Sequence, residues 1–214
     1  MNITEMMNAD DIAGTCLTNP AMYEAYRNMS FESGPVFVEE HLRRLVANGI
    51  QPHFMLGDLS QLETVERLIR KGHYQGPLVL NYVAIGSSAA GTHPADLIEF
   101  ARRVPDGAVL TIESIMRNVL PFNTMAIALG LHVRVGIEDN LWSRKGERMT
   151  SVQQVEQMVR IANELHRDVA SGTEAREIYQ IGTFYQSTDE TLRKLGYAPN
   201  RVPGQRGVPR WECA

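Results

Sequence analysis

The feature that most constrains the fold is an alternation of short apolar segments with segments of helical periodicity. Apolar, β-branched segments predict strands at residues 52–58, 78–85, 108–115 and 132–138. Apolar residues at three- and four-residue spacing predict helices at 60–71, from Pro94 to about residue 101, and at 121–129. Strands and helices that alternate at this pitch indicate βα units and a parallel sheet.

Two further regions extend the alternation. A segment at 11–17, followed by a helix around 38–47, predicts an earlier βα unit, and a helix capped by Ser151 predicts a later one. The apolar stripe expected on this last helix consists of Val152, Val155, Met158, Val159 and Ala162. About five βα units result. Either an open doubly wound sheet or part of a (β/α)8 barrel fits them. No Gly-rich phosphate loop follows any strand, so phosphate-loop motifs do not support a nucleotide-binding fold.

Composition and charge narrow the class of protein. The 214 residues are 43% hydrophobic and 21% charged, which is ordinary for a soluble globular protein. The net charge of −4 argues against general nucleic-acid binding. Cys16 and Cys213 do not form a disulfide framework, no apolar run could span a bilayer, and the amino terminus lacks signal-peptide features. We therefore expect a cytoplasmic protein without membrane or nucleic-acid partners.

Charged residues interrupt the last predicted strand. The β-branched positions are Val133, Val135 and Ile137, and the intervening positions are Arg134, Gly136 and Glu138. We expect Arg134 and Glu138 to share one strand face, with Gly136 keeping the space between them open. Charges on a buried strand indicate a polar site. Taken alone, however, the residues fit equally well with Glu138 and Asp139 as a helix N-terminal charge pair or a strand-end ion pair with Arg134.

The segment from Val133 to Asn140 resembles the signature of the β-keto acid cleavage enzymes. Weaker similarity covers most of the chain and lies at residues 49–53, 78–86, 115–117 and 173–177. Within it, His53 replaces a glutamate and Met116 replaces a glycine of the family pattern. Only the Arg-x-Gly-x-Glu-Asp-Asn core is specific.

The resemblance implies a zinc-dependent (β/α)8 TIM barrel and an acyltransferase reaction. A β-keto acid would exchange acyl groups with a CoA thioester such as acetyl-CoA, which releases acetoacetate and a new CoA ester. By position, Glu138 matches the family's carboxylate ligand to zinc, Arg134 its active-site arginine, and Asp139 an aspartate of proton transfer. Zinc can polarise a keto group, and an arginine can hold a carboxylate through two parallel hydrogen bonds.

The remaining candidate residues are less specific. The resemblance suggests that His53 contacts substrate, although a structural histidine fits nearly as well. Asn81 is a further substrate-binding candidate and Glu113 a weaker one, because the faces of their strands are not fixed by the pattern. Ser87 and Ser88 could meet a CoA phosphate, but a plain connecting loop fits better.

The chain departs from the family pattern in its metal ligands and in its length. The family's other two zinc ligands form a His-x-His pair, which is absent among the six histidines of this sequence. The chain resembles only the C-terminal five βα units of a barrel. The opening units are then on a separate polypeptide, removed by truncation, or lost in a fragment with another use.

These departures leave two alternative functions, and the similarity also predicts a domain organisation. The first function is the acyl exchange described above, carried out by a homo-oligomer or with a chain that supplies the missing strands. The second is that of a non-catalytic barrel fragment or assembly subunit without a complete metal site. We expect a partial barrel at residues 1–180. A C-terminal extension at 181–214 would wrap a neighbouring subunit or remain loosely ordered.

Overall fold

The computed structural model describes residues 34–84, 93–115, 119–144 and 146–205. The chain divides into two compact units, Met1–Glu40 and His41–Ala214. Of the first unit, the described residues comprise only the start of helix α3 (Pro35–Ala47), which agrees with the helix predicted around 38–47. The strand predicted at 11–17 and the loop containing Ser87 and Ser88 lie outside the described residues.

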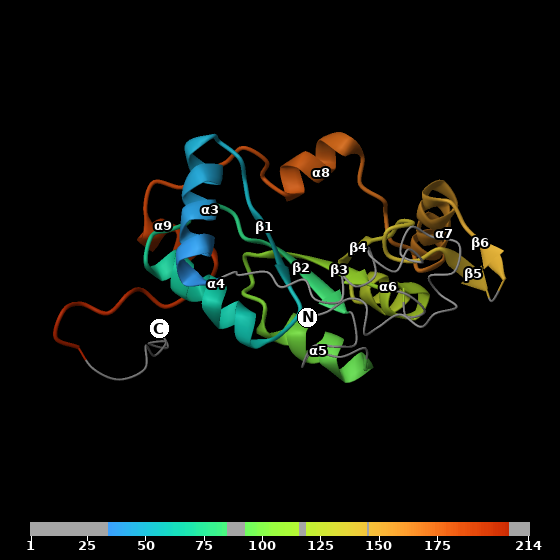
Figure 1. Cartoon of the computed structure of the whole chain (residues 1–214), viewed down its shortest axis with the longest axis horizontal. Helices are drawn as coiled ribbons and strands as arrows, with labels where there is room; N and C mark the ends of the chain where they lie inside the picture. Colours follow the sequence, from blue (N-terminus) through green and yellow to red (C-terminus); the bar gives the residue numbers. More distant parts are fainter. Residues whose placement is uncertain (1–33, 85–92, 116–118, 145, 206–214) are drawn as a thin grey trace, which may run out of the picture. The chain divides into compact units, whose positions relative to one another are not determined.

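A parallel four-stranded sheet forms the centre of the second unit (Figure 1). The strands are β1 (His53–Leu56), β2 (Val79–Ala84), β3 (Val109–Ser114) and β4 (His132–Arg134), in the spatial order β1-β2-β3-β4. The helices α4 (Ser60–Arg70), α5 (Pro94–Arg103), α6 (Val119–Ala128) and α7 (Ser151–Glu164) follow them in turn. The predicted βα alternation and parallel sheet are therefore confirmed. Strand order in chain sequence is consistent with a partial TIM barrel, and the described strands do not close one.

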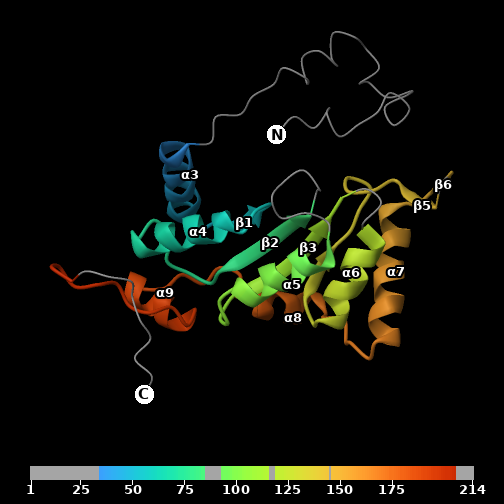
Figure 2. The same cartoon turned by 90° about the horizontal axis from the view of Figure 1, so that it is seen from below.

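One face of the sheet is apolar and carries the core. Its strand residues include Leu80, Tyr82, Leu110 and Ile112, and α4, α5 and α6 cover it (Figure 2). The rings of Tyr82 and Phe100 stack with centroids 4.3 Å apart, and both side chains are fully buried. Leu192 of α9 (Thr188–Lys194) and Leu195 beside it belong to the same core.

The opposite face of the sheet mixes polar and apolar residues, and we call it the polar face because Glu113 and Arg134 lie on it. The strand register and the alternation of side chains place these residues on it: His53, Met55, Val79, Asn81, Val83, Val109, Thr111, Glu113, His132 and Arg134. Helix α8 (Gly172–Ile178) lies on this side, away from α5 and α6 (Figure 1). Its own residues are not buried, and Tyr179 behind it reaches the sheet through the hydroxyl of Thr111.

The last strand is shorter than predicted. It ends at Arg134, and the backbone amides of Asp139 and Asn140 both donate to the carbonyl of Gly136, at 3.0 and 3.1 Å. These local hydrogen bonds form a turn in place of further strand pairing. Arg134 and Glu138 therefore do not share a strand face, and Gly136 does not hold them apart, because their side chains form an ion pair across the turn.

Helix α7 also differs from its prediction. Thr150, not Ser151, is the N-cap, and its side chain accepts from the backbone amide of Gln153. Val152 and Val155 are exposed, whereas Met158 and Ala162 are buried against Ile127. Relative to the predicted stripe, the buried side of the helix is shifted to include Gln154. Its side chain is buried and donates to the carbonyl of Asn140 at 2.6 Å.

A short antiparallel hairpin that the sequence did not suggest precedes α7. It consists of β5 (Trp142–Arg144) and β6 (Glu147–Arg148). Further along the chain, α9 (Thr188–Lys194) follows Ser187, which is its N-cap. Among the described residues, no helix is both long enough and apolar enough to cross a membrane.

Candidate functional site

Arg134 is the centre of an ion-pair cluster at the end of β4. Its backbone carbonyl accepts from Asn123 Nδ2 of α6 at 2.8 Å, which fixes the end of the strand against that helix. Its guanidinium contacts the carboxylates of three residues. Nη1 lies 2.9 Å from Glu113 Oε2, and Nη2 lies 3.2 Å from Asp139 Oδ1 and also bonds Glu138.

The three carboxylates differ sharply in burial. The side chains of Glu113 and Asp139 are 4% and 1% exposed, whereas that of Glu138 is 84% exposed. A buried carboxylate needs a charged or hydrogen-bonding partner, and a solvated one does not. Arg134 is therefore a required partner of the two buried groups and an exchangeable partner of Glu138.

Asp139 has the chemical properties of a proton acceptor. Burial raises the pKa of its carboxyl to about 6; Arg134 opposes this rise, and the neighbouring Glu113 and Glu138 add to it. Its Oδ2 is buried without a hydrogen-bond partner in the described part of the chain. A carboxyl group that titrates near neutrality can take up a proton and return it.

Asn81 joins this cluster through Glu113. Its Nδ2 donates to Glu113 Oε2 at 2.6 Å, and its Oδ1 is buried with no partner among the described residues. The structure thus brings four of the five sequence-predicted site residues together: Asn81, Arg134, Glu138 and Asp139.

His53 lies elsewhere on the polar face. It begins β1 in register with Val79 and Val109, four residues before the level of Glu113, which is roughly 13 Å along the strands. Its ring stacks on Tyr179 with centroids 5.6 Å apart, and burial lowers its pKa. His53 is thus an exposed residue whose described ring contact is the stack on Tyr179, and its role toward substrate stays a prediction.

Tyr179 connects several residues at this end of the sheet. The ring of His132 lies 5.7 Å from that of Tyr179, and burial lowers the pKa of this histidine as well. The hydroxyls of Tyr179 and Thr111 share a hydrogen bond of 3.0 Å, and Gln51 Nε2 donates to the Tyr179 carbonyl at 2.9 Å. These contacts attach α8 to the polar face.

Sequence reasoning gave too little weight to Glu113 and did not consider Asn123 or Tyr179. A glutamate within the apolar run 108–115 is a usable signal, as is an asparagine in the middle of the apolar helix α6. Tyr179 carries no such signal, because it follows a helix with no buried residue.

The described residues do not fit a zinc site by themselves. No three His, Cys, Asp or Glu residues in the described part of the chain form a group that could hold a metal ion. Glu138, the predicted ligand, is an exposed carboxylate bonded to Arg134, and His53 and His132 instead flank Tyr179.

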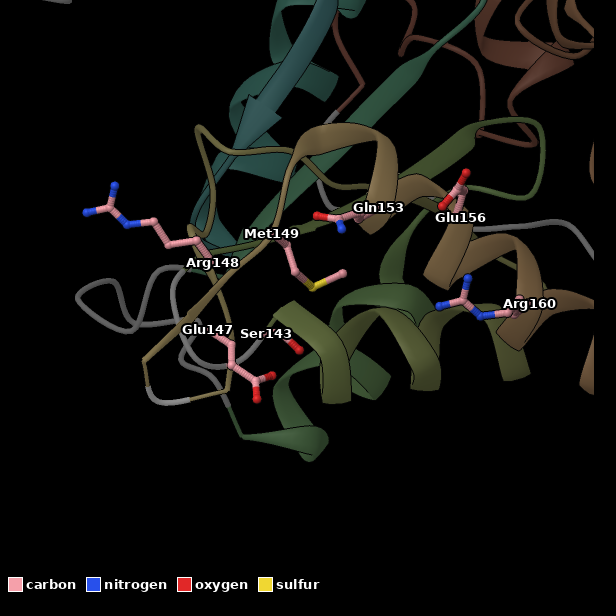
Figure 3. A pocket seen from close by; sticks show the side chains of 7 residues that line it. All are labelled: Ser143, Glu147, Arg148, Met149, Gln153, Glu156 and Arg160. Atoms are coloured by element: carbon pink, nitrogen blue, oxygen red, sulfur yellow. The ribbon is translucent and has the colours of Figure 1, made fainter.

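Two open hollows lie outside the Arg134 cluster. Figure 3 shows one of about 370 Å³ between the β5–β6 hairpin and α7, lined by Ser143, Glu147, Arg148, Met149, Gln153, Glu156 and Arg160. The other, of about 290 Å³, includes His132 and the residues around Pro105. Their linings contain neither Arg134 nor its buried partners Glu113 and Asp139.

Comparison with known proteins agrees with the signature around Arg134. The chain is 37% identical over 138 residues to 3-keto-5-aminohexanoate cleavage enzyme of Acetoanaerobium sticklandii, which covers 64% of this chain and 50% of that protein. It is 30% identical over 164 residues to 3,5-dioxohexanoate:acetyl-CoA acetone transferase of Paraburkholderia graminis, covering 74% and 53%. It is 28% identical over 145 residues to 3-dehydrocarnitine:acetyl-CoA trimethylamine transferase of Rhizobium meliloti, covering 66% and 47%.

The chain therefore spans about half the length of the curated relatives that it matches. The family model described as beta-keto acid cleavage enzyme matches residues 1–181. The chain belongs to the β-keto acid cleavage enzyme family.

Proposed function

We propose that the chain takes part in the cleavage of a β-keto acid with acyl exchange from acetyl-CoA. The keto acid R–CO–CH2–COO⁻ and acetyl-CoA would give acetoacetate and the thioester R–CO–S-CoA. The observation that carries the proposal is the cluster in which Arg134 holds the buried Asp139 beside an exposed, exchangeable Glu138. The activities named for the relatives support it, since two of them are transferases that use acetyl-CoA.

Arg134 is proposed to bind the carboxylate of the keto acid. The ion pair with the exposed Glu138 contributes little stability, because an exposed pair is screened by water. A substrate carboxylate can replace Glu138 at the guanidinium edge and form two parallel hydrogen bonds. We propose that the carbon next to that carboxylate is then within reach of Asp139, whose Oδ1 lies 3.2 Å from Nη2 of the same arginine.

Asp139 is proposed to transfer the proton of that carbon. It removes a proton from the CH2 group between the two carbonyl carbons, and the carbanion attacks the thioester carbonyl of acetyl-CoA, which expels the CoA thiolate. The thiolate then attacks the keto group that came with the substrate. The carbon–carbon bond beside it breaks, and Asp139 returns its proton to the acetoacetate carbanion. Atoms and charges balance over the cycle.

The metal and the oligomeric state belong to the same proposal. Zinc would polarise the keto group. Glu138 would be one of its ligands, and the others would come from polypeptide beyond the described residues. We further propose a homo-oligomer, or a chain that supplies the remaining barrel strands, acting in the cytoplasm. The C-terminal extension at 181–214 remains a proposed second part of the chain.

The test is a product assay on the purified protein with zinc, acetyl-CoA and a panel of β-keto acids. Mass spectrometry should detect acetoacetate together with a CoA ester that carries the acyl group of the keto acid. R134Q and D139N should lower the rate at least about 100-fold, because each removes a group that acts in the reaction. R148Q is the matched control, since Arg148 is exposed and packs over the Trp142 ring.

Two observations favour the second candidate, a non-catalytic barrel fragment or assembly subunit. The described residues contain no three-ligand metal group, and the sheet formed by the described strands has edges at β1 and β4. Metal analysis separates the candidates. Stoichiometric zinc that is lost in E138A supports the enzyme. A metal-free, monomeric, well-folded protein that forms no CoA ester supports the subunit.

A further inference from the structure

We propose that Glu113 is the positioning residue of this site, and that it fixes the guanidinium of Arg134 through one carboxylate oxygen shared with Asn81. The inference rests on the proposed function for its catalytic consequence. Its geometric part concerns the resting protein alone, and it can be tested without substrate.

One oxygen of Glu113 connects three strands. Oε2 accepts from Asn81 Nδ2 of β2 at 2.6 Å and from Arg134 Nη1 of β4 at 2.9 Å, while Glu113 itself belongs to β3. The parallel register places Arg134 directly beside Glu113 and places Asn81 two residues earlier, on the same face. Both donors therefore reach the carboxylate from opposite sides of its strand.

Burial distinguishes Glu113 from the other partners of Arg134. An exposed carboxylate such as Glu138 gains little from an ion pair and easily exchanges it for water. Glu113 is 4% exposed, so losing Arg134 would leave a buried carboxylate whose remaining donor among the described residues is the neutral amide of Asn81. Asp139 is equally buried, but it belongs to the turn after β4, whereas Glu113 lies within the sheet.

The consequence concerns which edge of the guanidinium is open. With Nη1 bound to Glu113 inside the sheet, Nη2 is directed toward Asp139 and Glu138. An incoming carboxylate meets a guanidinium whose rotation about the Nε–Cζ bond is already restricted. Less conformational entropy of the Arg134 side chain is therefore lost on binding. Without Glu113, Arg134 would still carry its charge but would no longer present a fixed edge beside Asp139.

The test uses arginine side-chain NMR of the whole chain without substrate, followed by kinetics. Wild-type Arg134 should give separate Nη resonances, because a guanidinium held on two sides rotates slowly. E113Q keeps the shape of the side chain and removes its charge, and it should merge or shift these resonances. E99Q is the matched control, since Glu99 also bonds two arginines, Arg102 and Arg103, but on an exposed helix surface.

In the acyl-exchange assay, E113Q should raise the KM for the keto acid at least about tenfold and leave that for acetyl-CoA nearly unchanged. Averaged Arg134 resonances in the wild-type protein, or identical spectra of wild type and E113Q, would overturn the inference. If wild type shows restricted Arg134 resonances but forms no product, the proposed function fails while the positioning by Glu113 stands. The wild-type spectrum also decides the geometry if E113Q does not fold.

Discussion

The two faces of the four-stranded sheet share one backbone and have opposite chemistry. The face toward α4, α5 and α6 is filled by Leu80, Tyr82, Ile112 and their neighbours, all almost fully buried. The other face carries Asn81, Glu113 and Arg134, linked to one another across the strands. Because strand side chains alternate, the chain can change one face without repacking the other.

The two faces contribute differently to the stability of the fold and to the chemistry of the site. Burial of the apolar face stabilises the fold, because it removes hydrocarbon from water in proportion to the area buried. The polar face buries charges at a desolvation cost that their mutual contacts must offset. We therefore expect substitutions on the apolar face to change mainly the free energy of unfolding, and those on the polar face to change mainly pH dependence and activity.

The largest effect is expected at Phe100, on the helix that covers the apolar face. Phe100→Ala should lower the free energy of unfolding by about 3–5 kcal/mol, because a fully buried ring is replaced by a cavity. Urea denaturation measures the loss. Ile98→Ala on the same helix is the control, since Ile98 is 50% exposed and should change stability far less. Equal losses at the two positions would mean that α5 does not cover the core as described.

Asp139 should make stability depend on pH in the direction opposite to an ordinary carboxylate. Its folded-state pKa of about 6 lies above the usual value of 3.8, so the folded protein binds the extra proton between these values. The stabilisation is full below pH 3.8 and is lost as the pH rises through 6. Relative to D139N, wild type should lose roughly 1–3 kcal/mol between pH 4 and 7.

Thermal or urea unfolding of both proteins across this range, with a metal chelator present, measures the difference. Subtracting the D139N curve removes the contribution of every other titrating group that the two proteins share. Parallel curves for wild type and D139N would show that Asp139 is not buried in the charged cluster.

Tyr179→Phe should have a smaller effect on the polar face. It removes the hydrogen bond to Thr111 and should cost about 1 kcal/mol of unfolding free energy. The ring stack with His53 is retained, so the loss should be confined to the hydroxyl. In a Thr111→Val background, Tyr179→Phe should cause little further loss. Additive losses in the double variant would mean that the two hydroxyls do not interact.

The smallest effects are expected at the N-caps of two helices, α9, which contributes to the apolar core, and α8, which lies on the side of the polar face. Ser187→Ala should lower the unfolding free energy by about 0.5–1 kcal/mol, because α9 contributes Leu192 to the apolar core. Ser171→Ala removes an equivalent cap from α8, which buries none of its residues, and should affect global unfolding less. Hydrogen exchange should then show local opening of α8. A larger global loss from S171A would reverse this ranking.

Local signals explain which parts of the molecule could be predicted from sequence. Periodicity gave the strands and helices, because burial repeats along each element, and the adjacent charges of Arg134, Glu138 and Asp139 indicated a polar cluster. The importance of Glu113 could not be predicted, since it depends on the register that places Arg134 beside it. The end of β4 was missed because the turn after it is closed by backbone hydrogen bonds, which β-branched side chains do not reveal.

The early end of β4 divides the ion-pair cluster between two structural elements. Arg134 is the last residue of the sheet, but Glu138 and Asp139 belong to a turn whose two backbone hydrogen bonds meet at the carbonyl of Gly136. The arginine and the two turn carboxylates are therefore placed by different constraints: pairing with β3 places Arg134, and local hydrogen bonds to one carbonyl close the turn that carries Glu138 and Asp139. A substitution that alters this turn changes the spacing of the charges without changing the strand register.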